Sequence, residues 1–165
     1  MPEIRLQRIL KVPPDPAAEA LGALLHAIAE QQGPWRGFAL HIGLGDLHLP
    51  DVGYVAVPID LTVASGSSRK QAFDITFRAT SHPSAFPAFN GTFAVDPHEL
   101  GECTLHLTGH YDLPLQAVGK LLDLALTPGV ARQSLENFIE EIAAACAARV
   151  NAREADFARY RFYRL

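Results

Sequence analysis

The sequence predicts a mixed α+β fold in which one antiparallel sheet is covered by helices. Apolar and polar residues alternate in several successive runs between residues 38 and 111, and the spacers between these runs are too short for crossover helices. A long apolar stripe with helical spacing follows near the C-terminus. Short spacers join antiparallel neighbours, and a sheet that is apolar on one face needs a second layer to cover it.

A strand and a helix open the chain. Residues 4–12 alternate loosely between apolar and polar, which predicts a first strand. Pro13-Pro14-Asp15-Pro16 ends this strand and favours a helix start, because proline is tolerated in a first helical turn and an acid there suits the helix dipole. Apolar residues then recur at helical spacing from Ala17 onward, until Gly33-Pro34 ends the helix.

Alternation with a period of two predicts the strands of the middle segment. These strands cover residues 38–44, 54–63, 73–78, 86–95 and 103–111. Asn90-Gly91 is a strong hairpin signal that would split residues 86–95 into two short strands. The longer alternation favours instead one continuous strand with a bulge at Gly91, and Gly109 indicates a bend in the last strand.

Two helices are predicted after the strands. A short helix over residues 115–122 carries Leu115, Val118, Leu121 and Leu122 on its apolar face. A long helix begins just after Pro128 and runs past Val150, with an apolar stripe formed by Leu135, Phe138, Ile139, Ile142 and Cys146. About 25 helical residues span roughly 38 Å, the width of a whole sheet.

Composition and length exclude several classes of protein. The 165 residues form one predicted domain, 1–165, with an apolar fraction large enough for a core. A net charge of -4 argues against nucleic acid as a partner, and two cysteines provide no disulfide framework. The longest apolar stretch, residues 17–29, is too short to cross a bilayer. The N-terminal residues lack a signal-peptide pattern, so we expect a cytoplasmic protein.

Several short segments occur together in an order that resembles a known superfamily. Residues 85–91 (AFPAFNG) precede an alternating strand, residues 105–114 read LHLTGHYDLP, and Gly119 and Leu122-Asp123 follow before the long helix. This order is similar to the uncharacterised bacterial branch of the SRPBCC or START-like superfamily, also called polyketide cyclase or dehydratase-like. In that branch, a strand ending in L-x-G-x-Y-x-x-P leads to a glycine and a Leu-Asp pair before the final helix.

The resemblance implies a helix-grip fold, in which an antiparallel sheet curls around a long C-terminal helix and leaves a cavity between them. It covers residues 50–148 well and residues 1–49 only in the order of elements. Members of the superfamily typically hold a lipid, sterol, polyketide or other apolar molecule in the cavity, and some are cyclases, dehydratases or hydrolases. The matching motifs are structural, so they favour a fold more than an activity.

Residues that share the inner face of the sheet, or the apolar stripe of the long helix, are the candidate lining of this cavity. They are His41, Gln71, Phe73, Phe77, Phe89, Phe93, Cys103, Leu107, Tyr111, Leu135, Phe138 and Ile142. Two alternatives remain at this point. The hydroxyl of Tyr111 either contacts a ligand or bonds to a backbone carbonyl, and the phenylalanines line a pocket or form an ordinary core.

Other kinds of chemical site find little support in the sequence. His106 and His110 share a strand face but lie about 13 Å apart, too far to bind one metal ion. Cys103 shares its face with leucines and is expected to behave as a small hydrophobe. Gly43-Leu44-Gly45 lacks the third glycine of a dinucleotide-binding loop. We therefore expect neither a metal nor a cofactor.

The C-terminal residues are basic and aromatic. Residues 149–164 contain five arginines and two acids, interleaved with phenylalanines and tyrosines. Such a pattern occurs in segments that bind nucleic acid or an anionic membrane. The favoured interpretation is that residues 151–165 are a frayed helix end or tail, packed on its own domain or on a second subunit in a homodimer.

Three functions are compatible with these patterns. The favoured one is a binding module for a small apolar or amphipathic molecule, because the sequence shows no catalytic constellation. The second is a cyclase- or dehydratase-like lyase or isomerase, in which Tyr111 and His41 would act as an acid–base pair. The third is an interaction protein whose interior is filled by its own side chains.

Overall fold

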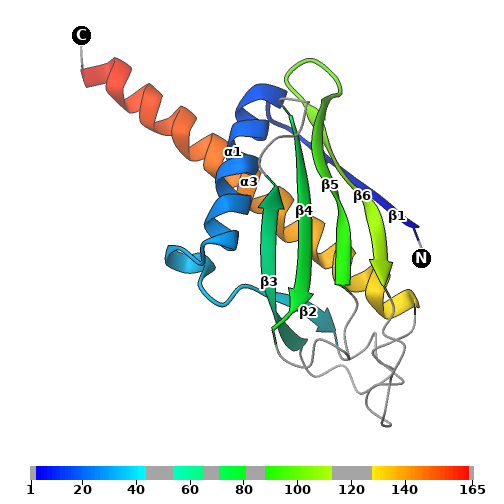
Figure 1. Ribbon diagram of the computed structural model, residues 1–165. Coiled ribbons are helices and arrows are strands. Elements are labelled where there is room, and N and C mark those ends of the chain that lie inside the picture. The colour runs from blue at the N-terminus through cyan, green and yellow to red at the C-terminus, as the bar shows by residue number, and fades with distance from the viewer. Residues whose placement is uncertain (1–2, 44–53, 65–70, 81–87, 113–127, 164–165) are drawn as a thin grey trace.

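The chain forms a strand, a helix, five further strands and a long helix within the residues that the structure describes. The computed structural model describes residues 3–43, 54–64, 71–80, 88–112 and 128–163. Its elements are β1 (Glu3–Leu10), α1 (Pro14–Ala29), the 3-10 turn η1 (Gly33–Trp35), β2 (Ala39–Gly43), β3 (Tyr54–Ala64), β4 (Ala72–Ala79), β5 (Ala88–Pro97), β6 (Cys103–Asp112) and α3 (Pro128–Tyr163). This order confirms the predicted one (Figure 1). The short helix predicted over residues 115–122 lies outside the described residues.

The described strands form a six-stranded sheet in the order β1-β6-β5-β4-β3-β2. Every neighbouring pair is antiparallel, as the short spacers predicted. Strands β2 to β6 follow one another along the chain and across the sheet, and β1 joins at the far side by pairing with β6. As a result, β1 and β2 are the two edges.

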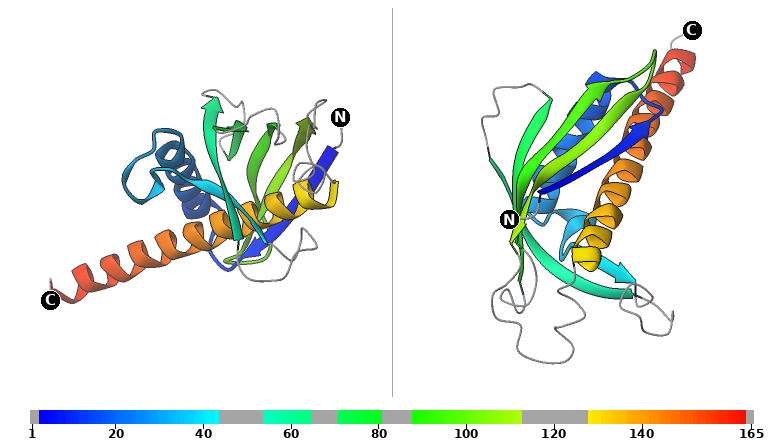
Figure 2. Two further views of the ribbon diagram at one scale, coloured as in Figure 1. Left: turned by 90° about the horizontal axis from the view of Figure 1, so that it is seen from below. Right: turned by 90° about the vertical axis from the view of Figure 1, so that its right-hand side faces the viewer.

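Both helices lie against the same inner face of the sheet (Figure 2). Helix α1 buries seven residues there, namely Ala17, Ala18, Ala20, Leu21, Leu24, Leu25 and Ile28. Helix α3 buries the whole predicted stripe of Leu135, Phe138, Ile139, Ile142 and Cys146. The sheet curls around α3, so the chain has the helix-grip fold that the resemblance implied.

Helix α3 connects the two edges of the sheet through neighbouring residues. Glu140 accepts a hydrogen bond from the guanidinium of Arg8 on β1 at 2.9 Å, and Glu141 contacts Nδ1 of His41 on β2 at 2.8 Å. The side-chain amide of Asn137 also donates to the carbonyl oxygen of His41 at 2.9 Å. Both ion pairs are exposed to solvent, so each contributes at most about 1 kcal/mol and mainly aligns the helix.

Two glycines face each other at the middle of the sheet. Gly91 on β5 is paired with Gly109 on β6. A Cβ at Gly91 would overlap the carbonyl oxygen of Thr108 and lie 2.7 Å from the ring of Phe89. A Cβ at Gly109 would overlap the carbonyl oxygen of Asn90 and lie 2.8 Å from the same ring. The strands therefore approach too closely for side chains here, and Phe89 occupies the space left free.

The register corrects one prediction at this place. β5 is one continuous strand, as predicted, but the bulge expected at Gly91 is wrong because pairing with β4 and β6 is unbroken from Phe89 to Phe93. Glycine is required here by the contact between neighbouring strands and the covering ring of Phe89, and not by an extra residue in the strand.

Helix α3 runs past Val150, as predicted. Its 36 residues continue through the C-terminal segment to Tyr163, so this segment is helical as far as that residue. The last part of α3 projects beyond the sheet and α1 (Figures 1 and 2).

We expect Gly91→Ala and Gly109→Ala each to lower the free energy of unfolding by about 2 kcal/mol or more, because the new methyl group meets the backbone of the neighbouring strand and the ring of Phe89. Gly22→Ala on α1 is the matched control. Its methyl group would meet only the end of the Phe73 ring, at 2.9 Å, and alanine favours the helix, so the expected change is below about 1 kcal/mol. Urea unfolding of the three variants measures this difference. Equal stabilities would show that the glycine pair is not under steric constraint.

Candidate functional site

The candidate site is the inner face of the sheet where β6 ends and β5 begins. Leu61, Phe77, Phe89 and Tyr111 form one row across β3, β4, β5 and β6, because each is paired with the next. All four side chains are buried, with Tyr111 5% exposed. Period-two alternation places each of them on the same face as the apolar core. The row thus brings together three of the sequence-predicted cavity residues.

An aromatic cluster fills the space between this row and α3. It consists of Phe38, Phe77, Phe89, Phe93 and Phe138. Phe77 stacks on Phe89 with ring centroids 5.1 Å apart. Phe138 of α3 lies at the centre, with centroids 5.6 Å from Phe77, 5.9 Å from Phe93 and 6.0 Å from Phe38. These separations are typical of rings in direct contact.

Tyr111 provides the polar group at the margin of this cluster. It is paired with Phe89 and lies on the same inner face. Within the part of the chain that the structure describes, no residue forms a hydrogen bond with its hydroxyl. A tyrosine hydroxyl in an apolar region normally has a partner. Among the described residues, no buried side-chain polar atom lacks a partner, so the hydroxyl of Tyr111 reaches the accessible surface, where water or a ligand atom can bond to it.

Four other predicted cavity residues are part of the surrounding core. They are Cys103, Leu107, Leu135 and Ile142, each 3% exposed or less. Leu107 is paired with Phe93 on one side and with Leu6 of β1 on the other. These side chains form the walls of the region and offer no polar group apart from the thiol.

Gln71 and Phe73 lie near α1, away from the row. The side-chain amide of Gln71 donates to Asp15 in the first turn of α1 at 2.6 Å. The half-buried ring of Phe73 packs against Gly22 of α1. The alternation along the strand predicted that both side chains lie on the inner face of the sheet. Helix α1 covers this part of the face, so both side chains contact the helix.

His41 lines a surface hollow beside α3 together with Asn137, Glu140 and Glu141. The hollow has a volume of about 390 Å³. The His41 side chain is 42% exposed and contacts Glu141, whereas Tyr111 belongs to the buried row. The structure therefore does not bring the two together as an acid–base pair.

Trp35 and Phe38 contribute to the region without having been predicted as site residues. Their ring centroids lie 5.9 Å apart, and Phe38 contacts Phe138. Both are half-buried and pack against the core. Phe38 begins the alternating run that predicted a strand over residues 38–44, whereas Trp35 lies in η1, where no periodic pattern marks a buried face. The sequence signal that could have indicated their burial is the presence of two aromatic residues, three positions apart, just after Gly33-Pro34.

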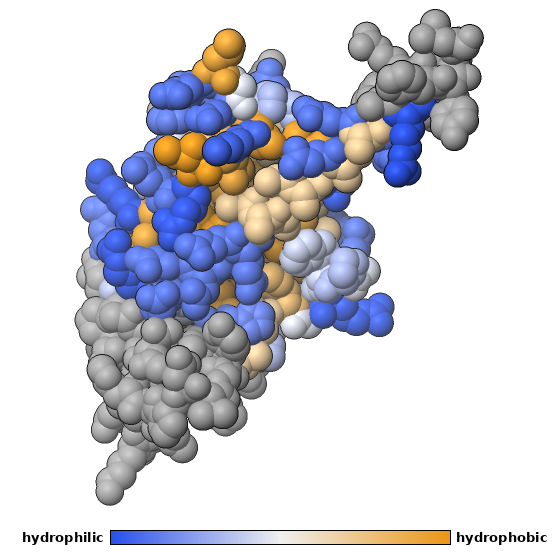
Figure 3. All heavy atoms as spheres, turned by 180° about the vertical axis from the view of Figure 1, so that it is seen from behind, coloured by the Kyte–Doolittle hydropathy of each residue, from blue (hydrophilic) through white to orange (hydrophobic). Residues whose placement is uncertain are grey.

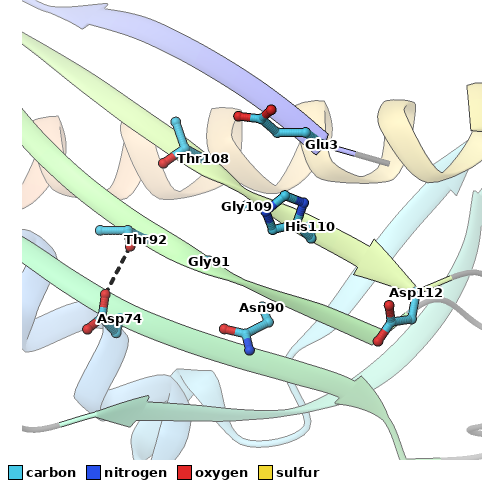
Figure 4. Close-up of a pocket in the computed structure, with 9 residues that line it drawn as sticks. All are labelled: Glu3, Asp74, Asn90, Gly91, Thr92, Thr108, Gly109, His110 and Asp112. Carbon is cyan, nitrogen blue, oxygen red and sulfur yellow. Dashed lines mark hydrogen bonds between the residues drawn. The ribbon is translucent and has the colours of Figure 1, made fainter. Parts of the chain in front are cut away.

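The outer face of the sheet carries a separate, polar hollow of about 430 Å³ (Figure 4). Its side chains come from β1, β4, β5 and β6, and include Asp74, Thr92 and His110. Thr92 donates to Asp74 at 2.9 Å. Mixed carboxylate, hydroxyl, amide and imidazole groups of this kind are typical of the solvated face of an antiparallel sheet.

The described residues contain neither a metal-binding group nor a helix that could span a membrane. In this part of the chain, no three histidine, cysteine or acidic side chains are grouped so that they could hold a metal ion. Nor does any helix within the described ranges have the length and hydropathy needed to span a bilayer.

Comparison with known proteins identifies similar folds but no matching sequence family. The sequence matches no protein-family model and no curated protein. A conserved protein from Geobacillus kaustophilus overlaps 89% of this chain and 96% of its own, with a TM-score of 0.53 and 11% identity. The protein TTHA0849 from Thermus thermophilus overlaps 92% of this chain and 99% of its own, with a TM-score of 0.46 and 18% identity. Ara h 8.0201 overlaps 92% of this chain and 98% of its own, with a TM-score of 0.49 and 11% identity. At 11% identity, the likeness to the Geobacillus protein is one of fold.

The two cysteines are expected to be unreactive in the folded protein. Burial, together with the smaller effect of the nearby Cys103, raises the pKa of the Cys146 thiol to about 12 against the opposing effect of Arg149. Burial also raises the pKa of Cys103. Because the thiolate is the nucleophile, we expect iodoacetamide at pH 9.0 to alkylate the folded chain at least about 100-fold more slowly than the urea-unfolded chain, in which cysteine has its ordinary pKa. Mass spectrometry over time measures both rates. Rapid incorporation of one equivalent into the folded chain would contradict this assignment.

Proposed function

We propose that this helix-grip chain binds a small hydrophobic or amphipathic molecule between the inner face of the sheet and α3, beside Tyr111. The single observation that carries the proposal is the buried row that ends in Tyr111. It combines aromatic walls with a hydroxyl that has no partner among the described residues. Sites for small apolar ligands generally have this composition, with predominantly apolar walls and a few polar groups that fix orientation.

The fold supports the same class of ligand. The superfamily that the sequence resembles typically holds lipids, sterols, polyketides or aromatic molecules between the sheet and the long helix. In this chain, the corresponding space lies between Phe77 and Phe89 on the sheet and Phe138 on the helix. The ligand class therefore follows from the resemblance, and the position follows from the row and the cluster.

The ring contacts define what binding would require. The ring of Phe77 touches the rings of both Phe89 and Phe138, so a ligand of several carbon atoms needs at least one of these rings to rotate or shift. The same contacts favour the competing function, an interaction protein whose interior is filled by its own side chains. The cyclase-like function gains no comparable support, because His41 lies in the surface hollow beside Glu141.

Native mass spectrometry of the chain purified from its own source distinguishes these functions. We expect a bound apolar molecule at about one per chain, which solvent extraction would then identify. An unliganded mass would leave two functions, a site that binds its ligand only transiently and an interior filled by side chains. A thermal-shift series with a long-chain fatty acid, a sterol and a polycyclic aromatic separates these two. Absence of stabilisation by all three would favour the filled interior over a binding site.

Tyr111→Phe tests the role assigned to the hydroxyl. It removes one oxygen atom without changing the ring, so we expect the affinity for the extracted molecule, or for whichever series member stabilises the chain, to fall about three- to tenfold. The stability of the unliganded chain should change by less than about 1 kcal/mol, because no described residue bonds to the hydroxyl. Isothermal titration calorimetry measures the affinity.

Thr76→Val is the matched control. It removes a hydroxyl from the exposed outer face of β4 and should leave the affinity unchanged. Equal affinities of Tyr111→Phe and the unaltered chain would show that the ligand makes no contact with this hydroxyl.

A further inference from the structure

The projecting end of α3 has little contact with the rest of the chain. Among the residues of α3 whose burial the structure describes, Val150 is the last buried one, whereas residues 151–156 and Arg159 are exposed. Among the described residues, the ion pair between Arg153 and Glu19 of α1, at 2.8 Å, ties this end to the domain. Exposed helical turns gain little stability without tertiary packing. A binding partner would therefore stabilise this end of α3.

Charge is divided along α3. Before Cys146, the helix carries three acids, Glu136, Glu140 and Glu141, against one arginine, Arg132. After Cys146 and up to Tyr163, it carries four arginines, at positions 149, 153, 159 and 161, against two acids, at positions 154 and 156. An antiparallel copy of the same helix would place the acidic part of one copy beside the basic part of the other.

The acidic part of α3 also forms a hollow. The surface hollow of about 390 Å³ described above is lined by His41, Asn137, Glu140 and Glu141. The side chain of Glu140 is 63% exposed and that of Glu141 is 41% exposed, although each already has a partner on an edge strand. Both carboxylates are therefore accessible to a second cation from outside the chain.

Small side chains separate this hollow from the projecting end. Ala144, Ala148, Ala152 and Ala155 are exposed and recur at intervals of four, four and three residues, which places them on one side of the helix. Figure 3 shows a pale apolar band running along this face toward the projecting end. Side chains of this size allow a second helix to approach to about 8 Å.

We propose that two copies of the chain pair through α3, antiparallel to each other about a two-fold axis. A register centred near residue 150 places Arg159 of each copy opposite Glu141 of the other, at the acidic hollow. The same register places Ala148 opposite Ala152. The contact is isologous, so each charge pair occurs twice.

A second copy fits this face better than an anionic polymer or membrane surface. The basic end alone would attract phosphate groups, but Glu140 and Glu141 on the same outward face would repel them. Only a partner that is acidic at one end and basic at the other matches the whole helix. A second α3 has this property.

Sedimentation velocity of the full chain, from about 1 to 100 μM, tests the proposal. We expect a monomer–dimer equilibrium. Arg159→Glu should weaken the dimer at least about tenfold, because it places like charges together twice. Glu141→Arg combined with Arg159→Glu should restore the affinity to within about threefold. Arg78→Glu makes the same change in net charge on the exposed outer face of β4 and should have no effect.

The outcomes separate the candidate partners. Circular dichroism melts show whether each variant is folded, which matters because Glu141→Arg also removes the contact with His41. A chain that stays monomeric at 100 μM overturns the proposal, and co-sedimentation of that monomer with anionic phosphatidylserine vesicles would assign the helix end to a membrane surface. A dimer that Arg159→Glu leaves unchanged also overturns it, because the contact would then lie elsewhere.

Discussion

The structure depends on helix α3 covering a sheet whose two edges are not joined to each other. Phe138 has a central part in this, because its ring contacts Phe38 before β2, Phe77 on β4 and Phe93 on β5. Burial of one such side chain contributes about 1.5–3 kcal/mol, more than the exposed ion pairs to Arg8 and His41. Apolar contact therefore holds the helix in place, and the ion pairs set its alignment with the edges.

The glycine pair connects this packing with the candidate site. Gly91 and Gly109 leave no side chains at the middle of the inner face, and the ring of Phe89 covers the vacant position. Phe89 also stacks on Phe77 and is paired with Tyr111. The position of the aromatic walls relative to the tyrosine hydroxyl thus depends on two residues that have no side chain.

The element order and the inner face of each strand could be predicted because alternation and helical spacing are properties of neighbouring residues. The bulge at Gly91 was predicted wrongly, because the reason for that glycine is a residue on another strand. Parity placed His41 and Phe73 on the inner face, but it could not show that α3 and α1 reach them there. Trp35 has no periodic context, so nothing in its segment indicated that it packs against the core.

Trp35 is the only tryptophan of the chain, and it lies at the outer end of a series of touching rings that continues through Phe38 to Phe138. Indole emission depends on the polarity and packing around the ring. The unmodified protein therefore contains its own optical probe at the margin of the aromatic cluster. Any rearrangement of Phe38 would change the wavelength or intensity of a single, unambiguous emitter, with no label attached.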